Sequence, residues 1–170
     1  IHVPAGFIKT MVDPKVNWLF DTEPEANLAG RQIPIPRGKV LGGSSSINGM
    51  IYVRGQARDY DMWGQLGNRG WSYADVLPYF KRSENREGGG DEFHGEGGPL
   101  NVADVTETYP LLDTVIDAAE EAGYPRNADY NGAEQEGFGY YQVTQKRGRR
   151  FSAKSAYLDP VRTRSNLHVQ

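Results

Sequence analysis

The sequence predicts an α/β fold class, with helices and strands in mixed α+β order along this stretch of chain. Apolar residues recur with helical spacing at 109–123, a β-branched and aromatic run lies at 51–54, and residues 138–144 alternate like a strand. Hydrophobic residues make up 38% and charged residues 24% of the 170 residues, values that are ordinary for a soluble globular protein. The length suits one domain or part of one.

The first half of the chain is expected to form extended segments and then two short helices. Prolines punctuate the amino-terminal part, which favours turns and extended chain there. The first helix is expected at 58–66. Ser72 is placed as the N-cap of the second, with Asp75 at the position where a capping box carries Glu or Gln. Pro78 lies inside this second helix, at 73–83, and predicts a kink or a break in it.

The second half is expected to alternate between short strands and helices. Pro110 and Gly123 bound the clearest helix, because proline suits a first turn and glycine suits the residue after a helix. A basic run at 146–150 is interpreted as a solvated loop. The remaining expected elements are a glycine-rich loop at 87–98, strands at 17–20, 99–102 and 166–170, and a helix at 152–158 with Ser152 as its N-cap.

Composition and charge argue against several classes of function. A net charge of −3 and a pI of about 5.6 argue against nucleic acid or an anionic membrane as the main partner. No cysteine is present, which excludes disulfides, a thiol nucleophile and thiolate metal sites. No run approaches the ~18 apolar residues of a membrane span. We therefore expect no transmembrane segment and a cytoplasmic location, with peripheral membrane association left open.

The histidines do not form a recognisable metal or catalytic pattern. His2, His94 and His168 are far apart, and none has the HxxxH or HExxH spacing of a zinc site, so no metal site is expected. His94 lies in the glycine-rich loop and is expected to be solvated or to make a local hydrogen bond. Spacing alone leaves a Ser-His-Asp triad open, but the GxSxG elbow is absent.

The stretch at 36–55 is the strongest candidate for a binding site. It contains five glycines and three consecutive serines, followed by apolar residues. Glycines let backbone N–H groups approach a ligand, and successive N–H groups in a turn bind anions. The GxGxxG and P-loop fingerprints are absent. A flexible, purely structural turn is the alternative, and the apolar residues that follow favour a buried ligand.

The same stretch resembles a known family signature. Residues 38–48, which read GKVLGGSSSIN, together with Tyr52, Gly55 and Asp61, are similar to the first signature of the glucose–methanol–choline (GMC) oxidoreductases. The choline dehydrogenase and acceptor-dependent alcohol dehydrogenase branch is the most similar. Further matching segments lie at 17–24, 59–63, 70–80, 94–100, 129–132 and 152–158, so the resemblance covers essentially the whole chain.

This resemblance implies an FAD-dependent oxidoreductase acting on the CH–OH group of an alcohol, with hydride transfer to flavin N5. It implies a Rossmann-type FAD domain and an antiparallel-sheet substrate domain. We assign 1–60 to the flavin segment, 61–150 to helices and the start of the substrate domain, and 151–170 to a return to the FAD domain. The chain is expected to be an internal fragment. The catalytic His is expected beyond residue 170, so the fragment alone is expected to be inactive.

The family roles transfer to the positions that match. Gly42, Gly43 and Ser44 are expected near the FAD pyrophosphate and ribityl group, and Asn48 and Gly49 along the isoalloxazine ring. The complete set of expected cofactor-binding residues is Val40, Gly42, Gly43, Ser44, Asn48, Gly49, Met50 and Ile51.

The expected partners follow from the same resemblance. Ile47 occupies the place where some members carry a flavin-linking His, so the FAD is expected to be non-covalent. A small-molecule alcohol is the expected substrate, and oxygen or a quinone-like compound is the expected electron acceptor. Two alternatives stay open. The chain could be a non-catalytic flavin- or nucleotide-binding module, or a stand-alone domain with a structural Gly-Ser loop.

Overall fold

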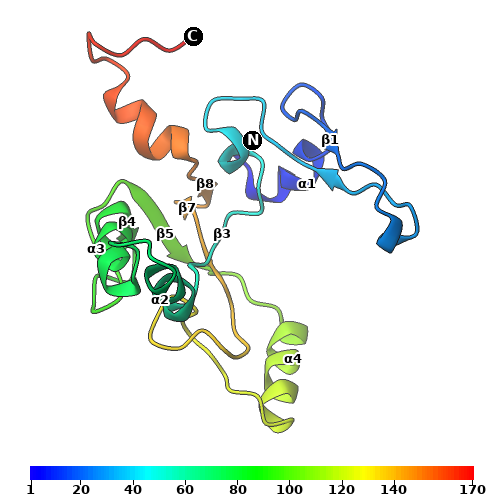
Figure 1. Cartoon of the computed structure of the whole chain (residues 1–170), viewed down its shortest axis with the longest axis vertical. Coiled ribbons are helices and arrows are strands. Elements are labelled where there is room, and N and C mark those ends of the chain that lie inside the picture. Colours follow the sequence, from blue (N-terminus) through cyan, green and yellow to red (C-terminus); the bar gives the residue numbers. More distant parts are fainter. The chain divides into compact units, whose positions relative to one another are not determined.

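The computed structural model describes residues 1–170 and divides them into two compact units (Figure 1). Unit 1 consists of Ile1–Met50 and Gln145–Gln170, and unit 2 consists of Ile51–Thr144. Unit 2 is therefore inserted in sequence between the two parts of unit 1. None of the helices combines the length and the apolar character that crossing a membrane requires.

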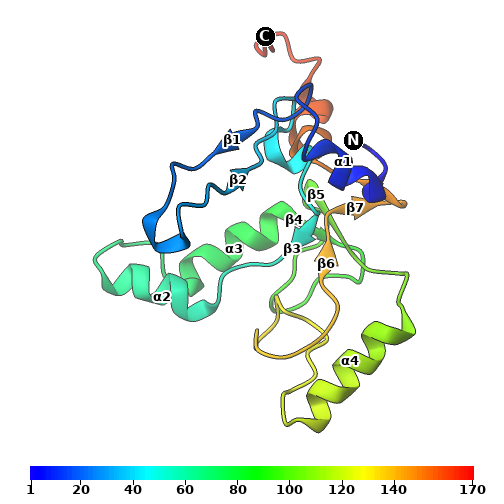
Figure 2. The same cartoon turned by 90° about the vertical axis from the view of Figure 1, so that its right-hand side faces the viewer.

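Unit 1 is built mostly from turns, short helices and two-residue strands. Strand β1 (Phe20–Asp21) pairs antiparallel with β2 (Pro34–Ile35), and Figure 2 shows these two strands side by side. Strand β7 (Gln145–Lys146) pairs antiparallel with β8 (Arg149–Arg150). The helical elements are η1 (Pro4–Gly6), α1 (Phe7–Thr10), η2 (Ala26–Leu28), η3 (Gly43–Ser46), η4 (Lys154–Leu158) and η5 (Asp159–Val161).

Unit 2 contains the longer helices and a four-stranded sheet with the order β3-β6-β5-β4. The pairs β3–β6 and β6–β5 are antiparallel, whereas β4 and β5 run parallel. The elements are β3 (Ile51–Tyr52), α2 (Ala57–Gln65), α3 (Tyr73–Ser83), β4 (Glu84–Arg86), β5 (Leu100–Asp104), α4 (Pro110–Glu121) and β6 (Gln142–Val143).

The helix ends follow the local sequence signals. The Ser72 side chain accepts from the N–H of Asp75, and the Asp75 carboxylate accepts in return from the N–H of Ser72, which completes the expected capping box of α3. Gly123 follows α4 with φ 92°, a conformation that glycine adopts without strain. The predicted break at Pro78 is wrong, because α3 continues through it. Proline removes only one backbone donor there, and the capped first turn holds the helix start.

The predicted strands exist where a partner strand is available. Only 142–143 of the alternating stretch at 138–144 forms a strand, and Phe138 makes an isolated bridge to Arg126. The strand expected at 17–20 is observed as β1, which starts only at Phe20. Leu19 has φ 53°, which is outside the extended conformation of a strand. No strand forms at 166–170, so that prediction is wrong. The helix expected at 152–158 appears as the π-helical η4, with the Ala156 N–H bonded to the Ser152 carbonyl.

Both units bury polar side chains beside apolar ones. Val102 and Ile116 are among the buried apolar residues of unit 2, and Ile47 and Met50 are among those of unit 1. Buried polar residues include Asn17, Arg54, Glu84, His94, Asn101, Asn131, Gln142 and Arg150. No buried side-chain nitrogen or oxygen lacks a hydrogen-bond partner. Two clusters of these residues, one in each unit, are the candidates for function.

Candidate functional site

Residues 38–49 of unit 1 form a tight turn, and we call it the glycine-serine turn. It contains η3, where the Gly43 N–H donates to the Val40 carbonyl oxygen at 2.8 Å and the Asn48 N–H donates to the Ser44 carbonyl oxygen at 2.9 Å. The sequence-predicted residues Val40, Gly43, Ser44 and Asn48 are thus brought together by backbone hydrogen bonds. The turn is a defined structure and not a flexible loop.

The glycines of the turn fall into two groups. A Cβ at Gly38 would lie 2.1 Å from the Gly43 carbonyl oxygen, and a Cβ at Gly42 would lie 2.6 Å from a serine hydroxyl of η3. The packing of the chain itself therefore requires glycine at these two positions. A Cβ at Gly43 would meet nothing within 4 Å, and one at Gly49 would meet only the Phe7 ring at 4.0 Å. Open space adjoins the backbone only at this second pair.

The three serine hydroxyls mostly serve the turn itself. Ser45 Oγ donates to the Gly42 carbonyl oxygen at 2.5 Å, and Ser46 Oγ donates to the Leu41 carbonyl oxygen at 2.9 Å. Ser44 Oγ accepts a backbone N–H at 3.1 Å, which leaves its own proton for another acceptor. Of the three hydroxyls, only that of Ser44 remains a donor toward a ligand.

Backbone donors in the turn supply the remaining binding capacity. No hydrogen bond within the chain uses the N–H groups of Leu41, Gly42 and Gly49. Orphan N–H groups at a glycine turn fit an anion or a carbonyl edge. FAD carries both, in its diphosphate and its ring, so the residues present fit the cofactor that the sequence resemblance implies.

Arg150 anchors the glycine-serine turn from β8. Its Nη1 donates to Asn48 Oδ1 at 2.7 Å and to the Ser45 carbonyl oxygen at 3.0 Å, while Nη2 donates to the Asn48 carbonyl oxygen at 2.6 Å and Nε to the Ile1 carbonyl oxygen at 3.1 Å. The side chain is 4% exposed. Residues 146–149 are exposed, as the interpretation of 146–150 as a solvated loop expects, but that interpretation is wrong for Arg150. The segment is the β7–β8 hairpin, and its last arginine is buried because these carbonyl groups receive its donors.

The last predicted site residues have different settings. Met50 is buried with φ 65°, and its N–H donates to Asn48 Oδ1 at 3.1 Å. A positive φ is uncommon for a side chain of this size and is strained. Ile51 lies at the start of β3 in unit 2 and is 56% exposed. Contact of Met50 or Ile51 with a flavin stays a prediction.

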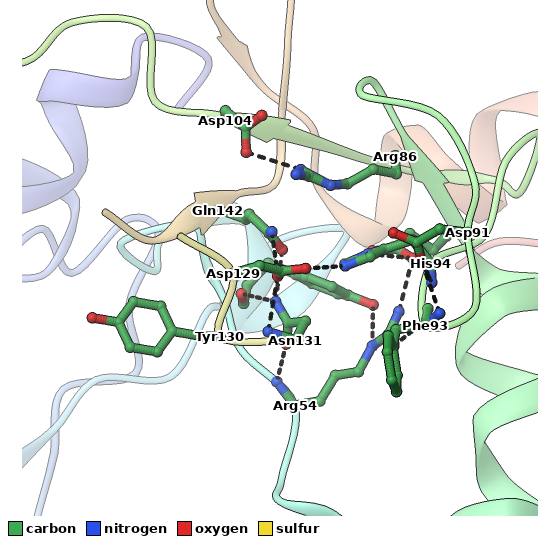
Figure 3. A network of polar contacts seen from close by, with 12 residues as sticks. Arg54, Arg86, Asp91, Phe93, His94, Asp104, Asp129, Tyr130, Asn131 and Gln142 are labelled. Atoms are coloured by element: carbon green, nitrogen blue, oxygen red, sulfur yellow. Dashed lines mark hydrogen bonds and ion pairs between the residues drawn. The ribbon is translucent and has the colours of Figure 1, made fainter. Parts of the chain in front are cut away.

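A second cluster, the His94 network, lies in unit 2 (Figure 3). His94 is 2% exposed and Glu84 is fully buried. His94 Nδ1 lies 3.1 Å from Glu84 Oε1, and its Nε2 lies 2.7 Å from Asp129 Oδ2. Glu84 also accepts from Arg54 Nη2 at 2.7 Å and from the Gly95 N–H at 2.8 Å. With His94 protonated, two cations face two carboxylates.

Amide side chains extend the His94 network across the sheet. Asp129 Oδ1 accepts from Gln142 Nε2 at 2.8 Å and from the Asn131 N–H at 3.0 Å. Asn131 Nδ2 donates to Gln142 Oε1 at 2.7 Å, and Asn131 Oδ1 accepts from the Arg54 N–H at 2.7 Å (Figure 3). The network thereby joins the ends of β3, β4 and β6 to the loop that carries His94.

The expectation for His94 is wrong, because the side chain is buried and bonded to distant residues. The glycines around it are the reason. A Cβ at Gly95 would lie 1.8 Å from the Lys81 carbonyl oxygen, and one at Gly98 would lie 2.4 Å from the Glu84 carbonyl oxygen. The glycine-rich loop therefore packs tightly against the end of α3 and β4. It places His94 in the interior, where both ring nitrogens are occupied.

The His94 network predicts that unit 2 loses stability as pH rises above neutrality. The hydrogen bond to Glu84, with that to Asp129, raises the pKa of His94 above its usual value although burial opposes this. A group with a raised folded pKa stabilises fully below its unfolded pKa of about 6.5 and loses that contribution as pH rises through the folded pKa. Urea unfolding of the full-length protein from about pH 6 to 9 should show this fall, with a slope of at most about 1.4 kcal/mol per pH unit.

The matching control is His94→Gln, which should be less stable at pH 6 and should flatten the profile over the same range. Asp129 acts in the opposite sense. Burial opposes ionisation, but the hydrogen bond from His94 lowers the pKa of Asp129, so its contribution is lost as pH falls. An identical pH slope in wild type and His94→Gln would contradict the role given to His94.

Comparisons with known proteins cover almost the whole chain. The family model described as GMC oxidoreductase matches residues 5–170. The oxygen-dependent choline dehydrogenases of Sinorhizobium fredii and Brucella anthropi are 51% and 52% identical over 169 residues. These matches cover 99% of this chain and 31% of each relative. The chain thus spans about a third of the length of these relatives.

Solved structures show the same similarity in three dimensions. Pyridoxine 4-oxidase from Mesorbium loti superposes with a TM-score of 0.92 at 35% identity, covering 98% of this chain and 33% of that protein. An FAD-dependent oxidoreductase from Chaetomium thermophilum superposes with a TM-score of 0.85 at 30% identity, covering 94% of this chain and 30% of that protein.

Proposed function

Because the chain belongs to the GMC oxidoreductase family, we propose that it forms part of the flavin-binding region of an FAD-dependent enzyme that oxidises the CH–OH group of an alcohol. The predicted family resemblance and fold class are confirmed, as is FAD as the cofactor of this family. The observation that carries the proposal is the glycine-serine turn, in which the N–H groups of Leu41, Gly42 and Gly49 are free and open space adjoins Gly43 and Gly49.

The residues of the turn have separate tasks in this proposal. The N–H groups of Leu41 and Gly42 and the hydroxyl of Ser44 bind the diphosphate and ribityl oxygens. The N–H of Gly49 meets the polar edge of the ring, and the buried Ile47 supports the turn from within. FAD, when bound, supplies the hydride acceptor at N5, while the protein binds and orients. No residue of this chain is proposed as the base.

Substrate, acceptor and domain assignment extend the proposal. Choline is the first alcohol to test, because the choline dehydrogenases named above share about half of their residues with this chain over its length. Oxygen or a quinone-like compound is proposed as the electron acceptor. We also propose that 1–60 and 151–170 belong to the FAD domain and 61–150 to the substrate domain, which draws on the division of the chain at Met50 and Thr144.

The direct test uses the purified full-length protein. Its absorbance spectrum should show bound flavin, and anaerobic addition of choline or another small alcohol should bleach the flavin bands. A colourless protein that takes up no FAD during reconstitution would contradict the proposal. A yellow protein that no alcohol bleaches would support the non-catalytic alternative instead.

Gly49→Val in the full-length protein should weaken FAD binding without a comparable loss of fold stability. The new side chain would enter open space in the chain but would occupy the volume proposed for the ring. Overpacking of this kind costs about 1–3 kcal/mol, so the Kd for FAD should rise roughly 5- to 150-fold. Fluorescence titration of the apoprotein measures this.

Gly6→Val is the control for that substitution, because a Cβ there meets nothing within 4 Å and the residue lies in unit 1 outside the turn. It should leave FAD affinity unchanged. Equal FAD affinity in wild type and Gly49→Val would remove Gly49 from the proposed binding surface.

The FAD should be non-covalent. Ile47 is aliphatic and buried, and the chain contains no cysteine that could form a thioether to the flavin. Acid precipitation of the full-length holoprotein should therefore release all yellow colour into the supernatant. Colour that stays with the pellet after washing would refute this expectation.

A further inference from the structure

The side chain of Arg150 donates four hydrogen bonds, and every acceptor is neutral. Three of the acceptors are backbone carbonyl oxygens and the fourth is the amide oxygen of Asn48. Arg150 forms no ion pair with any Asp or Glu of the chain. A buried charge is normally paired, because removal from water is costly. The positive charge of Arg150 is therefore uncompensated by this chain.

The surroundings of Arg150 add positive charge and no negative charge. An open hollow of about 500 Å³ beside it is lined by the cationic side chains of Lys146, Arg147 and Arg149, together with His2, Phe151 and Ser155. No carboxylate lines this hollow. Burial lowers the pKa of Arg150, but an arginine remains charged at any physiological pH. A permanent cation is thus held beneath the glycine-serine turn.

The contacts of Arg150 also hold the part of the turn that contains the strained residue Met50. Asn48 Oδ1 accepts both from Arg150 Nη1 and from the N–H of Met50, whose φ of 65° is strained. Gly49, with its free N–H, lies between these two residues. Loss of the guanidinium would leave Asn48 and Met50 free to relax and would move the N–H of Gly49.

We infer that Arg150 is a positioning residue for FAD. Its hydrogen bonds hold the Asn48–Met50 segment against the ring, and its charge favours reduced over oxidised flavin. The inference rests on the proposed function. Reduced flavin carries more negative charge than oxidised flavin. A fixed cation nearby therefore stabilises the reduced form more than the oxidised form. If Arg150 only held the segment in place, its loss would change the affinity for oxidised and reduced FAD equally.

Arg150→Gln and Arg150→Lys in the full-length protein separate these roles, with Arg149→Gln as the control on the exposed position of the same strand. FAD affinity is measured by titration of the apoprotein, and the two-electron reduction potential by equilibration with a reference dye. Arg150→Gln should bind oxidised FAD at least 10-fold more weakly. It should also lose at least 10-fold in its preference for reduced FAD, a fall of about 30 mV.

Arg150→Lys keeps the charge but cannot reach all four acceptors. It should bind FAD about 10-fold more weakly with a wild-type preference for reduced FAD, and it serves as the test if the glutamine variant does not fold. Arg149→Gln should match wild type in both quantities. Wild-type affinity and potential in Arg150→Gln would overturn the inference, as would an equal fall of potential in Arg150→Gln and Arg150→Lys. Wild-type protein that binds no FAD would refute the proposed function itself.

Discussion

Replacing Glu84 by glutamine should cost the full-length protein about 3–5 kcal/mol of unfolding free energy, the loss typical when one partner of a buried ion pair is removed. Glu84 is fully buried and faces the guanidinium of Arg54, the imidazole of His94 and the N–H of Gly95. Glutamine keeps the shape but removes the charge, and its NH₂ group points a donor at other donors. Two buried cations would then share only one carboxylate.

Urea unfolding followed by tryptophan fluorescence measures this loss, since Trp63 and Trp71 both lie in unit 2. Asp104→Asn is the control. Asp104 also pairs with an arginine, Arg86, at 2.9 Å, but its side chain is 63% exposed. Exposed pairs contribute about 0–1 kcal/mol. Similar losses of unfolding free energy in the two variants would show that Glu84 stabilises the protein no more than an exposed ion pair does.

The isolated 170-residue chain should show no alcohol oxidation, even with added FAD and a dye acceptor. It contains no GxGxxG with its ribose-binding acid, so the ADP half of FAD lacks its usual site. The base is expected outside these 170 residues, and general-base catalysis typically contributes about 10²–10⁴-fold. His94 cannot serve, because both ring nitrogens are bonded to carboxylates in the interior.

The full-length protein in the same assay is the positive control and should be reduced by at least one alcohol. FAD-dependent turnover by the isolated chain would contradict the expectation of an inactive fragment. The search for the base would then turn to His2 and His168, the two histidines outside the His94 network.

Local signals in the sequence predicted the helices well. The capping box of Ser72 and Asp75 and the proline at the start of α4 act within one turn of chain, so their meaning can be read from neighbouring residues. The glycine-serine turn was found in the same way. The cofactor role proposed for it rests on the resemblance to a family, because a glycine required by packing and a glycine that leaves room for a ligand look identical in a sequence.

The His94 network could not be predicted, because its partners are far apart in the chain. Glu84 and Asp129 lie 10 and 35 residues from His94, and no periodicity connects them. The available signal was the series of glycines around His94, which predicts only a glycine-rich loop. Gly95 is instead required by a backbone contact with Lys81. Arg150 was not predicted for a similar reason, since its acceptors lie 102, 105 and 149 residues earlier in the chain.

The insertion of unit 2 into unit 1 determines when the glycine-serine turn can be completed during synthesis. Ser45 and Asn48, which accept from Arg150, are synthesised first. Arg150 follows 102 to 105 residues later. At roughly 5–20 residues per second, that interval lasts about 5–20 s. All of unit 2 is synthesised within it, together with every partner in the His94 network. The inserted unit can therefore fold first, and the turn acquires its arginine anchor only afterwards, through a long-range contact of the kind that slows folding.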